Sequence, residues 1–231
     1  MNECEQVADG IWKGSGSRNN FYVVRDGESV CLVDTGYPGD LEAVDAACAH
    51  VGSSLADVTA VLLTHGHVDH MGSAAAMTTQ HGADVHCHTE EAAQVRGERI
   101  EQISTLYMVS RLWWPRMFSF VFNAVTMGGG KIDRVAEPRI FTHTMGALDL
   151  PGRPIPVFTP GHTSGHCAFH FPDRGALITG DALVTHDPLL QAFGPRLLHR
   201  AFNHDHAGAV RSLALLADRE ADVLAPGHGD L

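Results

Sequence analysis

The 231-residue sequence lacks any apolar run long enough to cross a membrane, and it is poor in basic residues. Lysine and arginine number 16 against 27 aspartates and glutamates, which gives a formal net charge of -11. Because a nucleic-acid surface needs clustered lysine and arginine, this composition argues against one. Residues 1–20 lack a basic start followed by an apolar core, so we expect no secretory signal.

Cysteine is scarce, and no two cysteines form a Cys-x-x-Cys pair. The sequence holds five, at Cys4, Cys31, Cys48, Cys87 and Cys167. An odd, scattered set favours reduced thiols over a disulfide framework, so we expect a cytoplasmic protein. The hydrophobic content of 44% is ordinary for a globular protein, and we expect residues 1–231 to form a single domain.

One short stretch concentrates side chains that bind metals. The apolar run 60–63 predicts a buried strand, and the small residues 73–77 predict a helix. Four candidate ligands lie between them: His65, His67, Asp69 and His70. This places them on a loop at the carboxyl end of a strand, where α/β sheets hold their ligands. Imidazole nitrogen and carboxylate oxygen are ligands of zinc and similar ions, so the stretch predicts a metal site.

Short strand signals recur along the rest of the chain, bounded by glycine, proline or aspartate. They lie at 10–13, 20–24, 29–33, 83–87, 139–142, 147–150, 155–159, 167–171, 176–179 and 222–225. Apolar residues at helical spacing predict helices over 38–50, 71–80 and 204–216. Segment 183–203 has no regular pattern. We therefore expect an α/β protein rich in short strands.

Three of these strands end beside a further candidate ligand. His162 follows strand 155–159, Asp181 follows strand 176–179, and His228 follows strand 222–225. Each stands next to a glycine, which lets the backbone approach a neighbour closely. A metal site on the first loop requires ligands from elsewhere in the chain, and these three residues meet that requirement.

Residues 96–130 differ in composition from their surroundings and suggest a helical insertion. Aromatic residues concentrate in a helix-like stretch over 99–123, which Pro115 interrupts, and three glycines at 128–130 end it. Core packing and a mobile lid over the site fit the pattern equally well. Contact with a membrane ranks third because few basic residues flank the segment. As a lid, it would place Trp113 and Phe118 in an apolar wall beside the metals.

The chain resembles the metallo-β-lactamase-fold hydrolases over nearly its full length. Five motifs carry the resemblance: Leu32-Val33-Asp34-Thr35-Gly36, Thr64-His65-Gly66-His67-Val68-Asp69-His70, Pro160-Gly161-His162-Thr163-Ser164-Gly165-His166, Thr179-Gly180-Asp181 and Pro226-Gly227-His228-Gly229. The resemblance implies a four-layer αββα sandwich, with a metal site along one edge. The ligand set looks most like the glyoxalase II and lactonase branches.

The resemblance also implies seven metal ligands and two ions. One ion would be held by His65, His67 and His162, the other by Asp69, His70 and His228, with Asp181 bridging both. Asp34 would orient a ligand histidine, and His166 would support the site through a hydrogen bond. The expected cofactors are two divalent ions, zinc first and iron or manganese as alternatives.

This metal pair predicts a hydrolase whose bridging hydroxide attacks an ester, thioester or lactone. Asp69 would orient the hydroxide and take up its proton, while Asp181 holds both ions. The expected partner is a small molecule with an apolar arm. An iron-dependent persulfide dioxygenase shares this ligand set and is the main alternative. A β-lactamase is a further one, although true lactamases usually have a cysteine or a non-ligand at the position of Asp181.

Overall fold

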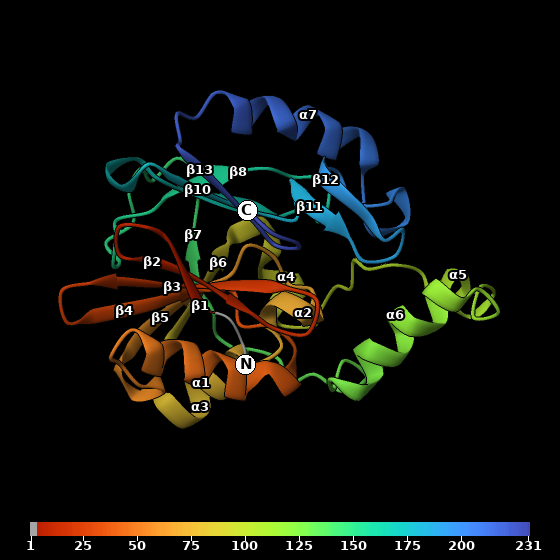
Figure 1. The fold of residues 1–231 in the computed structure, drawn as a ribbon, viewed down its shortest axis with the longest axis horizontal. Helices are drawn as coiled ribbons and strands as arrows, with labels where there is room; N and C mark the ends of the chain where they lie inside the picture. The colour runs from red at the N-terminus through yellow and green to blue at the C-terminus, as the bar shows by residue number, and fades with distance from the viewer. Residues whose placement is uncertain (1–3) are drawn as a thin grey trace.

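Two β-sheets packed face to face form the centre of this computed structural model, which describes residues 4–231 (Figure 1). The larger sheet has the order β1-β2-β3-β4-β5-β6-β7 and the smaller β13-β10-β9-β8. The larger contains β1 (Cys4–Ala8), β2 (Ile11–Ser15), β3 (Asn20–Asp26), β4 (Ser29–Val33), β5 (Val58–Leu62), β6 (Asp84–His88) and β7 (Arg139–Phe141). The smaller contains β8 (Ile155–Phe158), β9 (Cys167–Phe171), β10 (Ala176–Gly180) and β13 (Val223–Pro226).

Helices cover the outer faces of both sheets, which confirms the predicted αββα layers. Strands β1 to β4 are joined as antiparallel neighbours, whereas β4 to β7 run parallel and need crossover connections. Helices α1 (Leu41–His50) and α3 (Ala74–His81) make two of these crossovers and lie below the larger sheet in Figure 1. Helix α7 (His206–Ala217) lies above the smaller sheet and leads into β13.

The residues of β4 show how the sequence builds two apolar layers. Val30 and Leu32 pack with α1 and α3, while Cys31 and Val33 point into the space between the sheets. Because successive side chains of a strand face opposite ways, a strand covered on both faces is apolar throughout. All four side chains are fully buried.

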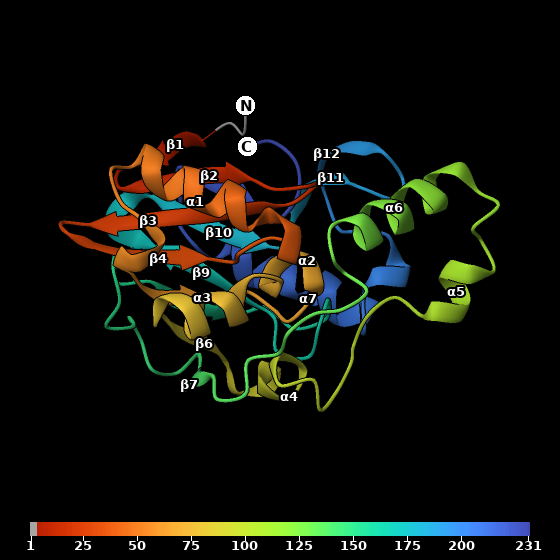
Figure 2. The ribbon, with the colours of Figure 1, turned by 90° about the horizontal axis from the view of Figure 1, so that it is seen from below.

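The insertion forms two helices, and the second begins at Pro115, the residue predicted to interrupt the helix-like stretch over 99–123. Helix α5 (Thr105–Val109) and helix α6 (Pro115–Thr126) project from the sandwich (Figure 2). Pro115 begins α6, where its missing N–H costs no hydrogen bond. We call residues 102–132 the arm. Three hydrogen bonds hold it to the loop before β3: from Arg18 to Ser119, from the Ser17 hydroxyl to Asn123, and from the Asn123 amide to the Ser17 carbonyl.

Two other expectations about the elements were wrong. No strand forms at 147–150, and the segment judged irregular holds a hairpin of β11 (Val184–Asp187) and β12 (Ala192–Arg196). Asp187 organises this hairpin because its buried carboxylate accepts hydrogen bonds from the backbone of Leu189, Leu190 and His199. Among residues 4–231, no helix has the length and apolar character needed to span a membrane.

Candidate metal centre

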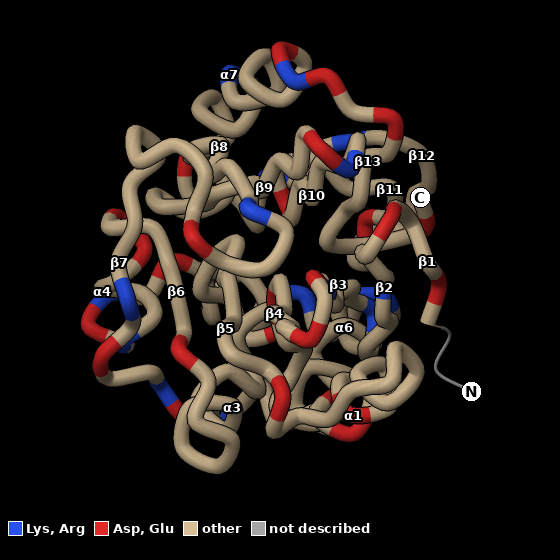
Figure 3. Tube along the Cα trace, turned by 90° about the vertical axis from the view of Figure 1, so that its left-hand side faces the viewer, with Lys and Arg blue, Asp and Glu red and all other residues tan. Residues whose placement is uncertain are grey.

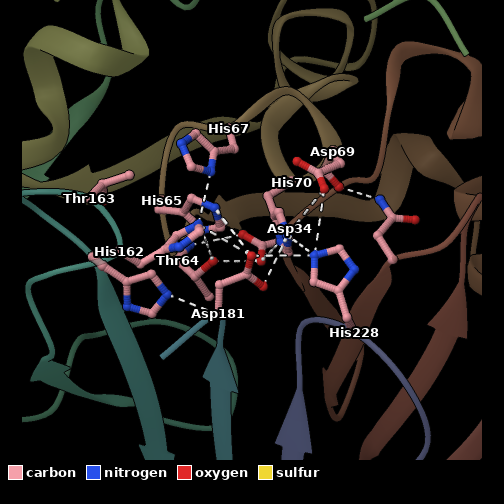
Figure 4. Close-up of polar contacts among 12 residues, drawn as sticks. Asp34, Thr64, His65, His67, Asp69, His70, His162, Thr163, Asp181 and His228 are labelled. Carbon is pink, nitrogen blue, oxygen red and sulfur yellow. Dashed lines mark hydrogen bonds and ion pairs between the residues drawn. The ribbon is translucent and has the colours of Figure 1, made fainter. Parts of the chain in front are cut away.

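The seven predicted ligands converge at one edge of the sandwich, where strands of the two sheets end together (Figure 4). Four come from the loop after β5, which includes the short helix α2 (Val68–Met71). The others follow β8, β10 and β13. Three groups have all their ligand atoms within 4.8 Å of one another: His65, His67 and His162; His65, His70 and Asp181; and Asp69, His70 and His228.

Asp181 lies between the two halves of the cluster (Figure 4). Its Oδ2 atom is 3.3 Å from Nε2 of His162 and 3.3 Å from Nε2 of His228. Its Oδ1 atom is 3.3 Å from Nε2 of His70. A Cβ atom at Gly227 would come within 2.3 Å of that Oδ1, so only glycine leaves room for the carboxylate.

The outward nitrogen of each of the five candidate ligand histidines faces a hydrogen-bond acceptor. The pairs are His65 with Thr64 Oγ1 at 3.0 Å, His67 with Glu101 O at 2.5 Å, His70 with Asp34 Oδ2 at 2.8 Å, His162 with Asn203 Oδ1 at 3.1 Å, and His228 with Arg18 O at 2.5 Å. These acceptors place a proton on the outer nitrogen and leave the inner nitrogen a lone pair.

The centre therefore contains acceptors that only a cation would satisfy together. Five inward nitrogens and two carboxylates meet there, and they include no N–H or O–H donor when the histidines are neutral. Two buried atoms, His65 Nε2 and Asp181 Oδ1, have no hydrogen-bond partner among the described residues. Nitrogen and oxygen donors of this kind suit zinc, iron and manganese, so the residues present fit a divalent metal site.

Burial and neighbouring charges shift the pKa values of the histidines in different directions on the two sides of the cluster. Burial holds the pKa of His65 and His162 well below the ordinary value, so both are neutral. Burial also lowers the pKa of His70, but the carboxylates of Asp181, Asp34 and Asp69 outweigh it and raise the value well above normal. The carboxylates that favour positive charge on His70 would equally favour a metal cation at the centre.

His166 supports the site from behind, as expected, rather than joining the ligands. Its Nε2 accepts a hydrogen bond of 3.0 Å from the backbone N–H of Asp181, and its Nδ1 lies 2.8 Å from Thr159 Oγ1. Burial lowers the pKa of His166 to about 3, which keeps the ring neutral and able to accept. His166 thus fixes the backbone that carries Asp181.

Two glutamates that the sequence did not single out connect the loop after β5 with the loop after β8. These loops carry the candidate ligands His65, His67 and His162. The carboxylate of Glu91, 1% exposed, accepts hydrogen bonds from Gly66 N at 2.7 Å, Thr163 Oγ1 at 2.8 Å and Gly165 N at 2.9 Å. The Glu101 carboxylate accepts from Ser164 N at 2.7 Å, while the backbone oxygen of Glu101 accepts from His67. No local signal marks Glu91, because the sequence around it indicates only the start of a helix.

A cavity of about 240 Å³ lies against the metal centre. His67, Asp69, His162, Asp181 and His228 form its polar end. Its other walls are largely apolar and include Ile103, Met108, Phe120, Val121, Leu198 and Phe202. The arm thus supplies much of the wall, but Trp113 and Phe118 do not. The expectation for these two residues was wrong: they are 82% and 57% exposed and face away from the cavity.

Comparison with known proteins agrees with this fold and site. The sequence profile described as the metallo-beta-lactamase superfamily matches residues 14–228. This chain therefore belongs to the metallo-β-lactamase superfamily, the class that the αββα sandwich and the edge cluster define. Among solved structures, it is similar to a metallo-beta-lactamase family protein of Thermus thermophilus, with 28% identity and a TM-score of 0.64. That match covers 97% of this chain and 75% of the other.

Two further relatives carry functional names. The "probable metallo-hydrolase YflN" of Bacillus subtilis is 27% identical, over 91% of this chain and 80% of its own length. A hydroxyacylglutathione hydrolase of Anaeromyxobacter dehalogenans is 28% identical, over 73% of this chain and 47% of its own length. The family and the fold are thus established. The substrate and the role of each candidate ligand are proposed from the geometry of the site.

Proposed function

We propose that this protein is a hydrolase that uses two divalent metal ions to cleave an ester, thioester or lactone bond in a small molecule. The observation that carries the proposal is the convergence of seven candidate metal-binding side chains, five of them histidines whose outer nitrogens already face hydrogen-bond acceptors. The superfamily and the metallo-hydrolase name of YflN support the class of reaction.

The proposed ligand sets follow the geometry of the cluster. One ion would be held by His65, His67 and His162, and the other by Asp69, His70 and His228, with Asp181 touching both. Zinc is the expected metal, with iron and manganese as alternatives. When bound, such a pair supplies Lewis acidity and lowers the pKa of a water molecule toward neutrality.

Side chains of the protein would then accept the proton and bind the substrate. Asp69 lines the cavity and its side chain is 17% exposed, so it can accept the proton that the attacking water releases. Its Oδ2 atom lies 3.6 Å from Nε2 of His228, so these two candidate ligand atoms of the second proposed site lie side by side. No serine or cysteine nucleophile is needed. Cys167, for example, is fully buried, and burial raises the pKa of its thiol.

The cavity favours a substrate with an apolar arm. No lysine or arginine is among the residues that line it, and its basic groups are the three histidines of the metal cluster. A carboxylate or phosphate group would therefore find no permanent cation beyond the metal ions. Apolar walls instead favour acyl or aromatic groups, because each buried methylene adds about 0.8 kcal/mol of binding.

Elemental analysis combined with chelation tests the proposal. Protein purified without added metal should contain two ions per chain, lose ester hydrolysis when they are chelated, and recover it when zinc is restored. A preparation that hydrolyses esters with one ion or none would refute the dinuclear assignment. A single iron together with oxygen consumption in the presence of a persulfide would indicate the dioxygenase alternative instead.

A further inference from the structure

The outer face of the arm exposes large apolar side chains. Trp113 is 82% exposed, Leu106 is 78% exposed, and Phe118, Phe122 and Val125 are each more than half exposed. The rings of Phe118 and Phe122 stack with their centroids 6.0 Å apart on one side of α6. Soluble proteins rarely leave such a group in water unless a partner covers it.

The arm also differs from the rest of the chain in charge. Residues 102–132 contain Arg111, Arg116 and Lys131 but no aspartate or glutamate, although the chain as a whole has a net charge of -11. Figure 3 views the molecule from the side opposite the arm and shows acidic residues spread over its helices and loops. Arg96 and Arg99, just before the arm, pair with Glu98 and Glu101, whereas the three basic residues within the arm contact no carboxylate among the described residues. The arm therefore complements an anionic partner.

A second copy of the chain is a poor match for the exposed apolar side chains and the positive charge of the arm. In a symmetric pair the same patch lies on both sides of the interface, so arm would meet arm, and residues 102–132 contain no carboxylate to pair with the basic residues of the other arm. An arm seated on the acidic body of the next copy would make a head-to-tail contact, which continues as an open chain unless it closes into a ring. Neither arrangement combines matched charges with a simple closed dimer.

An anionic phospholipid surface fits both features. Phenylalanine, tryptophan and leucine side chains enter the boundary between headgroups and acyl chains, while lysine and arginine contact the headgroups. The same helix continues into the cavity wall, since Phe120 and Val121 line the cavity and Val125 belongs to both surfaces. We propose that the arm docks on the surface of an anionic phospholipid bilayer. Docking does not depend on the hydrolase function proposed above.

Co-sedimentation of the full chain with vesicles tests this directly. Vesicles of phosphatidylglycerol and phosphatidylcholine should bind the protein, more weakly as salt rises, and pure phosphatidylcholine vesicles should bind far less. Combining Phe118→Ser and Phe122→Ser should weaken binding at least about tenfold, because two aromatic rings no longer leave water. Lys131→Gln should weaken it about fivefold. The matched control combines Val210→Ser and Leu215→Ser, two exposed positions on α7, and should bind like the parent.

Tryptophan fluorescence provides a second readout. Anionic vesicles should shift the emission to shorter wavelength as Trp113 leaves water. Trp113→Phe should abolish most of that shift while co-sedimentation persists. The proposal is overturned if anionic vesicles leave both signals unchanged, or if the α7 control loses as much binding as the arm variant. It is equally overturned if sedimentation velocity finds a dimer that the arm substitutions dissociate while no vesicle binding occurs.

Discussion

Asp34 Oδ2 lies 2.8 Å from Nδ1 of His70 and also accepts a hydrogen bond of 2.7 Å from Thr64 Oγ1. That hydroxyl in turn lies 3.0 Å from Nδ1 of His65. One carboxylate therefore orients a histidine of each proposed metal subsite. Its backbone has a φ of 61°, a left-handed conformation that is rare outside glycine, which fits a position with a functional constraint.

Asp34→Asn should consequently weaken both subsites. The amide cannot accept from His70 and Thr64 through the same charged oxygen, so we expect metal affinity or kcat to fall about 10- to 100-fold. Competition with a chelator measures the affinity. Asp45→Asn changes an exposed carboxylate on α1 and should leave both quantities unchanged. Parental affinity in Asp34→Asn would show that the hydrogen bonds do not position the ligands.

Asp181→Asn should have a larger effect, because it removes a proposed bridging ligand rather than its support. We expect at least one ion to be lost, with a fall in kcat of more than about 100-fold. Metal content and hydrolysis rates measure this. Exposed Asp173→Asn is the control, whereas Asp187 would be a poor one because its buried carboxylate holds the β11–β12 hairpin. Two ions in Asp181→Asn would remove this residue from the bridge.

Glu91 should make stability depend on pH. Burial, aided by the negative charge of Glu101, raises the pKa of Glu91 from 4.5 to about 7, despite its hydrogen bonds with Thr163, Gly66 and Gly165. The folded state therefore keeps a proton that the unfolded chain releases near pH 4.5. The resulting stability is complete below pH 4.5 and is lost as the pH rises to about 7, amounting to roughly 3 kcal/mol.

Urea unfolding at about pH 5 and about pH 8 checks this expectation. Glu91→Gln cannot titrate, so its free energy of unfolding should fall less than that of the parent between the two pH values. Glu90→Gln alters the exposed neighbour and should follow the parent. If Glu91→Gln and the parent change equally, Glu91 does not hold a proton in the folded state.

The cavity predicts selectivity for the length of an acyl chain. For p-nitrophenyl esters of rising length, kcat/KM should rise about fourfold per methylene until the cavity is filled, as about 0.8 kcal/mol per methylene implies. Phe120→Ala should flatten this trend without changing metal content, because Phe120 lines the cavity. Phe122→Ala, on the outer face of the same helix, should keep it. A flat trend in the parent would point to small polar esters.

Short-range patterns predicted a strand-rich α/β protein and the candidate ligands at its strand ends, whereas the four-layer sandwich and the division of seven ligands between two ions followed from the family resemblance. His65, His67, Asp69 and His70 share one loop, and the remaining ligands each follow a strand whose apolar run is plain. Parallel strands that end at a common edge then bring such residues together. Their roles as metal ligands remain predictions, because they depend on the chemistry rather than on position alone.

The orientation of the arm and the burial of Glu91 could not be predicted, because both depend on packing between residues far apart in the sequence. Both sides of α6 are apolar, with Phe120 on the inner side and Phe118 on the outer, so helical periodicity cannot tell which faces the cavity. Glu90 and Glu91 are neighbours that indicate the same helix start, yet one is exposed and the other is 1% exposed. The approach of the loops that hold Gly66 and Thr163 distinguishes them.

The candidate metal ligands and the apolar wall come from different parts of the chain, so substrate preference can change without a change in metal binding. All seven candidate ligands come from the two sheets and their loops, whereas much of the apolar wall comes from residues 102–132. An engineer could therefore graft a different arm onto this scaffold to change its selectivity. Such a graft would have to retain Ser119 and Asn123, because they anchor α6 to the loop whose Arg18 carbonyl orients His228.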